Sequence, residues 1–183
     1  MKILIFGASG SGTTTLAKEI EKNTDFVHLD VDDYYWKRTE PPFQEKISLI
    51  QRNQHLKADY QKFENVIVSG SMVSWGKEWQ KAFDLAIFIH LDNAERMNRL
   101  YQREQQRYGD KLLTDKIIRQ NSKAFLAWAN QYENPNFEGR SLKIHTDWIQ
   151  LLQCTVLRID GGKTLKDKTE KVLIEIRKIV SNK

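Results

Sequence analysis

Three glycines and three threonines follow the first apolar run of the chain, and their order is typical of a loop that binds phosphate. The frame is G-x-x-x-x-G-x-T, formed by Gly7, Gly10, Ser11, Gly12, Thr13, Thr14 and Thr15. Glycines let the backbone wrap around an anion with its N–H groups pointing inward, and a helix that starts directly afterwards adds its positive end. A structural turn would need one glycine rather than three. We therefore predict that these residues bind a nucleotide and that the Thr14 hydroxyl faces Mg²⁺.

The same loop lacks the lysine that this frame normally contains. Thr13 stands at the lysine position, where an ammonium group usually reaches the β and γ phosphates. An electrostatic contact of this kind contributes several kcal/mol to a transition state. Lys18 lies one helical turn beyond Thr14 and is not expected to return to the loop. Either a cation elsewhere replaces the lysine, or the protein binds nucleotides with little turnover.

An acidic turn follows the second predicted strand. It contains Asp30, Asp32 and Asp33 in "HLDVDDYYW". Three carboxylates repel one another unless Mg²⁺, a substrate ammonium or a basic side chain neutralises them. The alternative interpretation is that Asp32 or Asp33 caps a helix.

Four arginines recur at spacings of three, four and four residues. They are Arg96, Arg99, Arg103 and Arg107, and this spacing places them near one face of a helix. Guanidinium groups bind phosphate oxygens in a bidentate manner. The alternative is a solvated face in which Glu95 and Glu104 pair with them. Gly109 follows as a candidate hinge for a lid.

Several further residues allow two interpretations each. Gly70, after the third strand, would permit close approach of a ligand. Trp75 would form a flat wall against a base or sugar, or pack in the core, and the same choice applies to the aromatic run of Tyr34, Tyr35 and Trp36. Arg140, Ser141 and His145 share a polar, aromatic stretch, in which a lone histidine is more often structural than a ligand.

The elements that must position these residues alternate along the chain. Short apolar runs predict strands at 2–6, 26–29, 65–69, 85–90 and 155–159, and helical periodicity predicts helices at 13–21, 46–63, 94–108, 114–132, 141–152 and 165–180. This alternation predicts an α/β fold, a three-layer α/β/α sandwich around a five-stranded parallel sheet. Ligands of such sheets bind at the carboxyl ends of the strands.

Composition limits the possible classes of protein. The 183 residues include one cysteine, and no apolar run approaches the length of about 20 residues that a membrane span needs. We expect one compact domain over residues 1–183, no membrane partner, no export signal and a cytoplasmic location. The net charge of +5 raises the question of nucleic acid. Much of the excess falls in the C-terminal helical pattern, where lysines lie between apolar positions, so a nucleic-acid partner is disfavoured.

These motifs together resemble the P-loop nucleoside and nucleotide kinases, the adenylate-kinase-like group that includes shikimate and gluconate kinases. "GASGSGTTTLAKEI", "DVDDYYW", "SGS" with "WG", "RYGD" and "EGRSLKIHTDW" resemble bacterial AAA-family ATPases and, more distantly, the topology-modulation proteins. The resemblance implies ATP and Mg²⁺ as cofactors, a helical lid at about 103–140 and an acceptor-side flap at about 31–63. It places Asp30 beside the metal, Asp32 beside the acceptor, Arg103 and Arg107 on the transferring phosphoryl group, and Gly161 against adenine.

Three functions remain open from the sequence. The first is transfer of the γ-phosphoryl group of MgATP to a small acceptor such as a nucleoside, a nucleotide or another hydroxyl compound. The second is a nucleotide-binding regulatory protein with little catalysis, and the third is modulation of nucleic acid. A GTPase is disfavoured because the N-K-x-D signature is absent. The sequence predicts neither the acceptor nor the oligomeric state.

Overall fold

A parallel sheet of five strands forms the centre of the computed structural model, which describes residues 1–181. The strands are β1 (Lys2–Gly7), β2 (Val27–Asp30), β3 (Val66–Ser69), β4 (Leu85–His90) and β5 (Thr155–Asp160), in the order β2-β3-β1-β4-β5. All four strand pairs are parallel. The predicted sheet is therefore confirmed.

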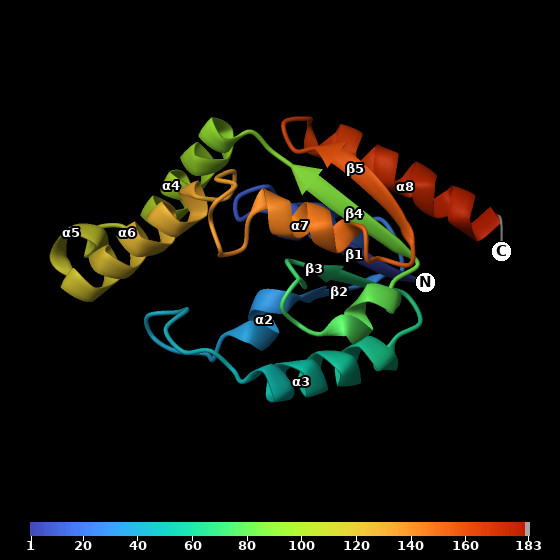
Figure 1. Cartoon of the computed structure of the whole chain (residues 1–183), viewed down its shortest axis with the longest axis horizontal. Coiled ribbons are helices and arrows are strands. Elements are labelled where there is room, and N and C mark those ends of the chain that lie inside the picture. The colour runs from blue at the N-terminus through green and yellow to red at the C-terminus, as the bar shows by residue number, and fades with distance from the viewer. Residues whose placement is uncertain (182–183) are drawn as a thin grey trace.

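Helices cover both faces of this sheet, as predicted (Figure 1). Side chains of β1 alternate between two cores: Ile3 and Ile5 pack with α1 (Thr13–Lys22) and α8 (Leu165–Ser181). Leu4 and Phe6 pack on the other face with α3 (Leu49–Lys62), the short 3-10 helix η1 (Lys77–Lys81) and α7 (Leu142–Ile149). Period-two alternation in a strand that is buried on both sides gives a continuous apolar run, which is why the sequence of β1 reads as one.

A helical arm leaves the sheet after β4. It consists of α4 (Asn93–Tyr108), α5 (Lys111–Thr114) and α6 (Lys116–Asn130), and α4 and α6 pack against each other through Met97, Leu100 and Ala129. Figure 1 shows this arm reaching away from the sheet on the same side as the loop between α2 (Val31–Tyr35) and α3. No helix of residues 1–181 has the length and apolar character that crossing a membrane requires.

The helix boundaries differ from prediction at two places where a side chain caps the backbone. Periodicity predicts one helix at 114–132, whereas Asp115 interrupts it and accepts hydrogen bonds from the N–H groups of Ile117 and Ile118. The helix predicted from residue 46 begins at Leu49 because Ser48 caps it. Sequence periodicity does not detect such caps. It also does not predict α2, because a helix of five residues is too short to show a repeat.

Candidate functional site

The glycine-rich loop between β1 and α1 has a conformation that only glycine adopts readily at two positions. Gly10 and Gly12 have φ of 86° and 97°, in the left-handed region that disfavours side chains. A Cβ at Gly10 would lie 2.9 Å from the Arg96 carbonyl oxygen, so the loop packs tightly against α4. A Cβ at Gly12 would meet only the Arg99 guanidinium, at 3.9 Å. The loop is therefore fixed on one side and open on the other.

Backbone donors of the loop are free to bind an anion. Within the described residues, no hydrogen bond starts from the N–H groups of Gly10, Gly12, Thr13 or Thr14. The first bond of α1 runs from Leu16 N–H to the Gly12 carbonyl at 3.0 Å. Unpaired N–H groups at the positive end of a ten-residue helix form a site for phosphate. The loop therefore fits the polyphosphate of a nucleotide.

Ser11 and Thr15 differ from the loop residues whose N–H groups are unpaired. Ser11 is fully buried, its N–H donates to the Ala8 carbonyl at 3.1 Å, and its hydroxyl has no hydrogen-bond partner among the described residues. The Ser11 N–H closes the turn in this structure, and a contact between Ser11 and phosphate stays a prediction. Thr15 is exposed on the first turn of α1.

A hydroxyl and a carboxylate meet where Mg²⁺ is predicted. The Thr14 hydroxyl donates to Asp30 Oδ2 at 2.8 Å, and Asp30 Oδ1 accepts from the Asp32 N–H at 3.0 Å. Asp30, rather than Asp32 or Asp33, therefore caps the short helix α2. The described residues contain no cluster of three His, Cys, Asp or Glu side chains that forms a complete metal site. The donors present suit Mg²⁺ that takes its remaining ligands from phosphate and water.

Asp32 is the second residue of α2 and lies in an environment that disfavours its charged form. Solvent still reaches the side chain, but the surrounding protein desolvates the carboxylate and raises the pKa of Asp32, and the Asp30 carboxylate raises it further. Arg140 and Arg103 lower the same pKa. The site therefore combines a carboxylate prone to take up a proton with two cations that stabilise its charged form.

The four arginines of α4 do not act as one stripe. Arg96 is fully buried, and its Nη1 donates to the carbonyls of Ser9 at 3.4 Å and Ala129 at 3.0 Å. Its Nη2 bonds Glu133 Oε2 at 2.8 Å. Arg96 is thus neither solvated nor free for phosphate: it ties the loop to the base of the arm. Arg99 pairs with Glu95 on the exposed face.

Arg103 and Arg107 lie further out on the arm. Arg103 is exposed above the Phe125 ring, with its guanidinium carbon 5.6 Å from the ring centroid. The guanidinium carbon of Arg107 lies 4.5 Å from the centroid of the Phe43 ring, and its Nη1 lies 3.4 Å from Glu104 Oε1.

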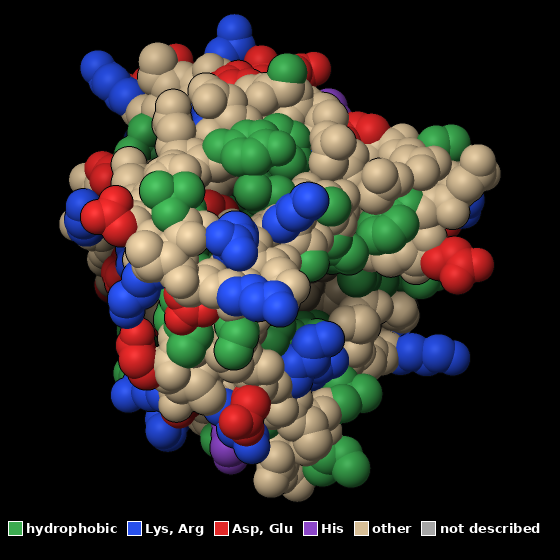
Figure 2. All heavy atoms as spheres, turned by 90° about the vertical axis from the view of Figure 1, so that its left-hand side faces the viewer, with side chains coloured by type: hydrophobic (Ala, Val, Ile, Leu, Met, Phe, Trp, Pro, Cys, Tyr) green, Lys and Arg blue, Asp and Glu red, His purple; other side chains and the backbone are tan. Residues whose placement is uncertain are grey.

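Contacts between the arm and the segment after α2 bring the two sides of the site together. Besides the Arg107 stacking on Phe43, Asn121 donates to Gln44 Oε1 at 2.8 Å and Lys111 lies 3.7 Å from Glu40. Figure 2 views this side of the molecule, where Lys and Arg side chains gather across the middle of the surface.

Arg140 is the residue that sequence reasoning named without giving it a role. Its Nη2 donates to the Ser9 hydroxyl in the loop at 2.8 Å, and its guanidinium carbon lies 4.9 Å from the centroid of the Trp128 ring. Desolvation lowers the pKa of Arg140, which Asp32 opposes. The only signal in the sequence was its place just before α7, since no local pattern relates residue 140 to residue 9.

His145 belongs to a buried polar network. The ring is fully buried on α7, with Nε2 2.8 Å from the Ser71 hydroxyl and Nδ1 2.7 Å from the Tyr132 hydroxyl. Desolvation lowers the pKa of His145 to about 3, and Arg140 contributes in the same direction. The imidazole is therefore neutral at physiological pH and has the structural role that the sequence favoured.

Two residues after β3 have packing roles where a ligand contact was one of the interpretations. Trp75 is 1% exposed in the core beneath the sheet, which excludes it as a wall for a base or sugar. Gly70 has φ of 112°, and a Cβ there would lie 2.1 Å from Val31 Cγ2. The close approach at Gly70 is that of α2 rather than of a ligand. Tyr34, Tyr35 and Trp36 are half-buried.

Gly161 begins the turn after β5 and its backbone is already engaged. Its N–H donates to the His90 carbonyl at 2.6 Å, and its carbonyl accepts from Lys168 Nζ at 3.1 Å and Arg99 at 3.4 Å. These contacts hold the turn beside the loop. A contact between Gly161 and adenine stays a prediction.

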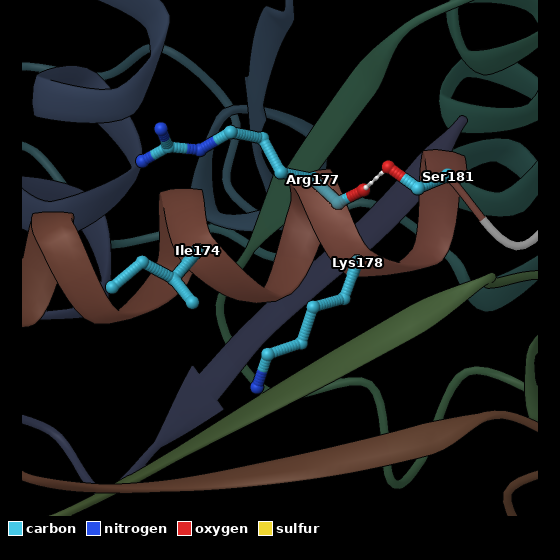
Figure 3. A pocket seen from close by; sticks show the side chains of 4 residues that line it. All are labelled: Ile174, Arg177, Lys178 and Ser181. Atoms are coloured by element: carbon cyan, nitrogen blue, oxygen red, sulfur yellow. Dashed lines mark hydrogen bonds between the residues drawn. The ribbon is translucent and has the colours of Figure 1, made fainter.

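A shallow depression on α8 lies apart from these residues. Ile174, Arg177, Lys178 and Ser181 line it, and Figure 3 shows that their long side chains point away from one another. The Ser181 hydroxyl donates to the Arg177 carbonyl at 2.9 Å. Converging polar groups are the mark of a site, so the residues at the carboxyl ends of the strands remain the candidate.

Comparison with known proteins now gives the family. The sequence profile of the AAA domain family matches residues 3–124, which include the loop, the acidic turn and the arginines of α4. The chain belongs to this family. The uncharacterized protein YqaC of Bacillus subtilis (strain 168) is 37% identical to this AAA-domain protein over 171 residues, covering 93% of this chain and 94% of YqaC.

Solved structures show the fold. A shikimate kinase from Bacteroides thetaiotaomicron has a TM-score of 0.59 at 17% identity, covering 97% of this chain and 98% of that one. A deoxyadenosine kinase from M. mycoides, with dCMP and dCDP bound, has a TM-score of 0.56 at 14% identity, covering 97% and 100%. The fold is that of the P-loop kinases, which confirms the resemblance drawn from the motifs.

Proposed function

We propose that this protein is a phosphotransferase that moves the γ-phosphoryl group of MgATP to a small acceptor. The observation that carries the proposal is the meeting of three features at one edge of the sheet. They are the free N–H groups of the loop, the bond between Thr14 and Asp30, and an Asp32 carboxyl whose charged form is stabilised by the positive charges of Arg103 and Arg140. The kinase fold supports the reaction class.

Each group has a chemical role in this proposal. Bound MgATP supplies the electrophilic phosphoryl group. The N–H groups of Gly10, Gly12 and Thr13 would hold phosphate oxygens. Thr14 and Asp30 would hold Mg²⁺. Asp32 accepts the proton of the acceptor hydroxyl, a task for which a raised pKa is suited. Arg103 and Arg107 steady the transferring group as the arm closes.

Release of ADP, coupled to a spectroscopic readout, tests the proposal on a panel of nucleosides, nucleotides and small hydroxy acids. We expect turnover with one class of acceptor and a loss of about 10²-fold or more in kcat for Asp32→Asn, within the range for general base catalysis. Asp33→Asn, which removes a neighbouring exposed carboxylate, is the matched control. Nucleotide binding without transfer to any acceptor would contradict the proposal.

A second candidate function has its own observation in Thr13. A loop without its lysine favours a protein that binds nucleotide and responds to it with little chemistry. Thr13→Lys separates the two functions, because turnover rises strongly if the native loop is chemically weakened and falls if Thr13 belongs to a working site. Modulation of nucleic acid predicts salt-dependent binding to DNA, and absence of binding at low ionic strength would remove it.

A further inference from the structure

Because the loop has no lysine, another side chain must supply the positive charge beside the phosphates. The arginines near the loop are the candidates. Arg96 contacts the loop, but its guanidinium is enclosed and neutralised by Glu133. Arg99 lies beside Gly12 and is neutralised by Glu95. Neither of these cations has an uncompensated charge to offer a ligand.

Arg140 differs from both. In the described part of the chain it makes no ion pair, and the Ser9 hydroxyl is the one hydrogen-bond acceptor its guanidinium meets. A guanidinium has five N–H donors, so most of them remain available. The Trp128 ring covers one side of the group. Asp32 attracts the Arg140 guanidinium but makes no ion pair with it among the described residues, so an anionic ligand can still complete the surroundings of this cation.

The position of Arg140 identifies the anion. Ser9 belongs to the same loop whose N–H groups are unpaired, so the guanidinium and these donors border one space. Arg103 also makes no ion pair among residues 1–181, but it is exposed on the arm and touches no loop residue. Arg140 is therefore the cation that the fold itself, without movement of the arm, brings to the loop.

We propose that Arg140 supplies, from the segment before α7, the positive charge that Thr13 cannot, and that it binds the polyphosphate of a nucleotide held in the loop. The inference rests on the nucleotide binding of the proposed function and does not depend on the acceptor. Arg140 should therefore favour nucleoside di- and triphosphates. Adenosine has no phosphate that Arg140 could bind, and AMP has only one.

Calorimetric titration of MgATP, MgADP, AMP and adenosine into the whole protein tests this assignment. We expect Arg140→Met to weaken binding of MgADP and MgATP by roughly 10- to 100-fold, the range for one charge-assisted hydrogen bond. Binding of adenosine should change by less than about threefold, since it lacks the charged group. Arg158→Met removes an exposed arginine on β5 and controls for net charge.

Two further variants test whether Arg140 acts through its charge on phosphate or only through its hydrogen bond to Ser9. Arg140→Gln keeps a donor for the Ser9 hydroxyl without the charge, and we expect the same loss as for Arg140→Met. Adding Thr13→Lys to either variant should restore about 10-fold of the lost affinity. Equal losses for all four ligands, full binding by Arg140→Gln, or no recovery with Thr13→Lys would overturn the proposal.

The outcomes also distinguish this inference from the proposed function. If the unaltered protein binds neither MgATP nor MgADP, both are wrong. If it binds them with the dependence on Arg140 described above but no acceptor is phosphorylated, phosphotransfer is wrong and the role of Arg140 stands. If phosphotransfer occurs and Arg140→Met binds all ligands normally, the role of Arg140 alone is wrong.

Discussion

Replacing His145 by glutamine removes a titratable ring from the centre of the buried network and should flatten the acid side of the stability profile. The folded pKa of about 3 lies below the value of 6.5 for a free histidine. Between pH 3 and pH 6.5, His145 is protonated in the unfolded chain but not in the folded protein. The free energy of unfolding therefore falls as the pH falls below 6.5, and this loss levels off near pH 3.

The magnitude follows from the fully buried ring. One pKa unit corresponds to about 1.36 kcal/mol, and pH 5 lies about 1.5 units below the unfolded value, so His145 accounts for about 2 kcal/mol of the loss between pH 7.5 and pH 5. A folded pKa one unit higher or lower leaves this result almost unchanged. Solvent does not screen the effect, since the ring is 0% exposed.

Urea unfolding at several pH values between 5 and 7.5 measures the effect for the unaltered protein and for His145→Gln. Carboxylates contribute to both profiles, so the informative quantity is the difference between the two slopes. We expect the variant to lose about 2 kcal/mol less on acidification. His55→Gln is the matched control, because solvent reaches His55 on α3 in the folded chain. Parallel profiles for the unaltered protein and His145→Gln would refute the reasoning.

Three further substitutions test the site and its support. Asp32→Asn should raise the melting temperature of the nucleotide-free protein at pH 8 as it lowers kcat, because the raised pKa of Asp32 means that ionisation opposes folding as the pH rises; a melting temperature no higher than that of the unaltered protein would contradict this. Gly10→Ala should cost about 2 kcal/mol in urea unfolding through strain and contact with α4, whereas Gly109→Ala, with nothing within 4 Å, should cost about half as much; equal costs would count against it. Arg96→Met should cost about 3 kcal/mol, because it removes a buried guanidinium with its partly buried ion pair to Glu133 and leaves two backbone carbonyls without their donor. Arg99→Met, which breaks an exposed ion pair, should cost under about 1 kcal/mol. Urea unfolding measures both losses, and similar values would refute the division of the arginines.

The phosphate loop and the elements around it follow from short-range sequence patterns. Positive φ angles require glycine at Gly10 and Gly12, and a short apolar run that ends at a glycine-rich turn is typical of a buried strand. The spacing of Thr14 and of the acidic turn after β2 then predicts that they meet, because parallel strands end at one edge of the sheet. The Thr14 to Asp30 distance of 2.8 Å agrees with that expectation.

Other roles depend on which segments the fold brings together. Helical spacing places Arg96 and Arg107 on one face of α4, but it does not say that Arg96 meets the buried Ala129 carbonyl while Arg107 meets Phe43. The sequence likewise gives no reason to connect Arg140 with Ser9, which lies 131 positions earlier. Periodicity reports how a side chain is oriented on its own element, whereas the opposing surface comes from distant segments. Only the tertiary structure therefore decides which arginine borders the loop without an ion pair among the described residues and which is already neutralised.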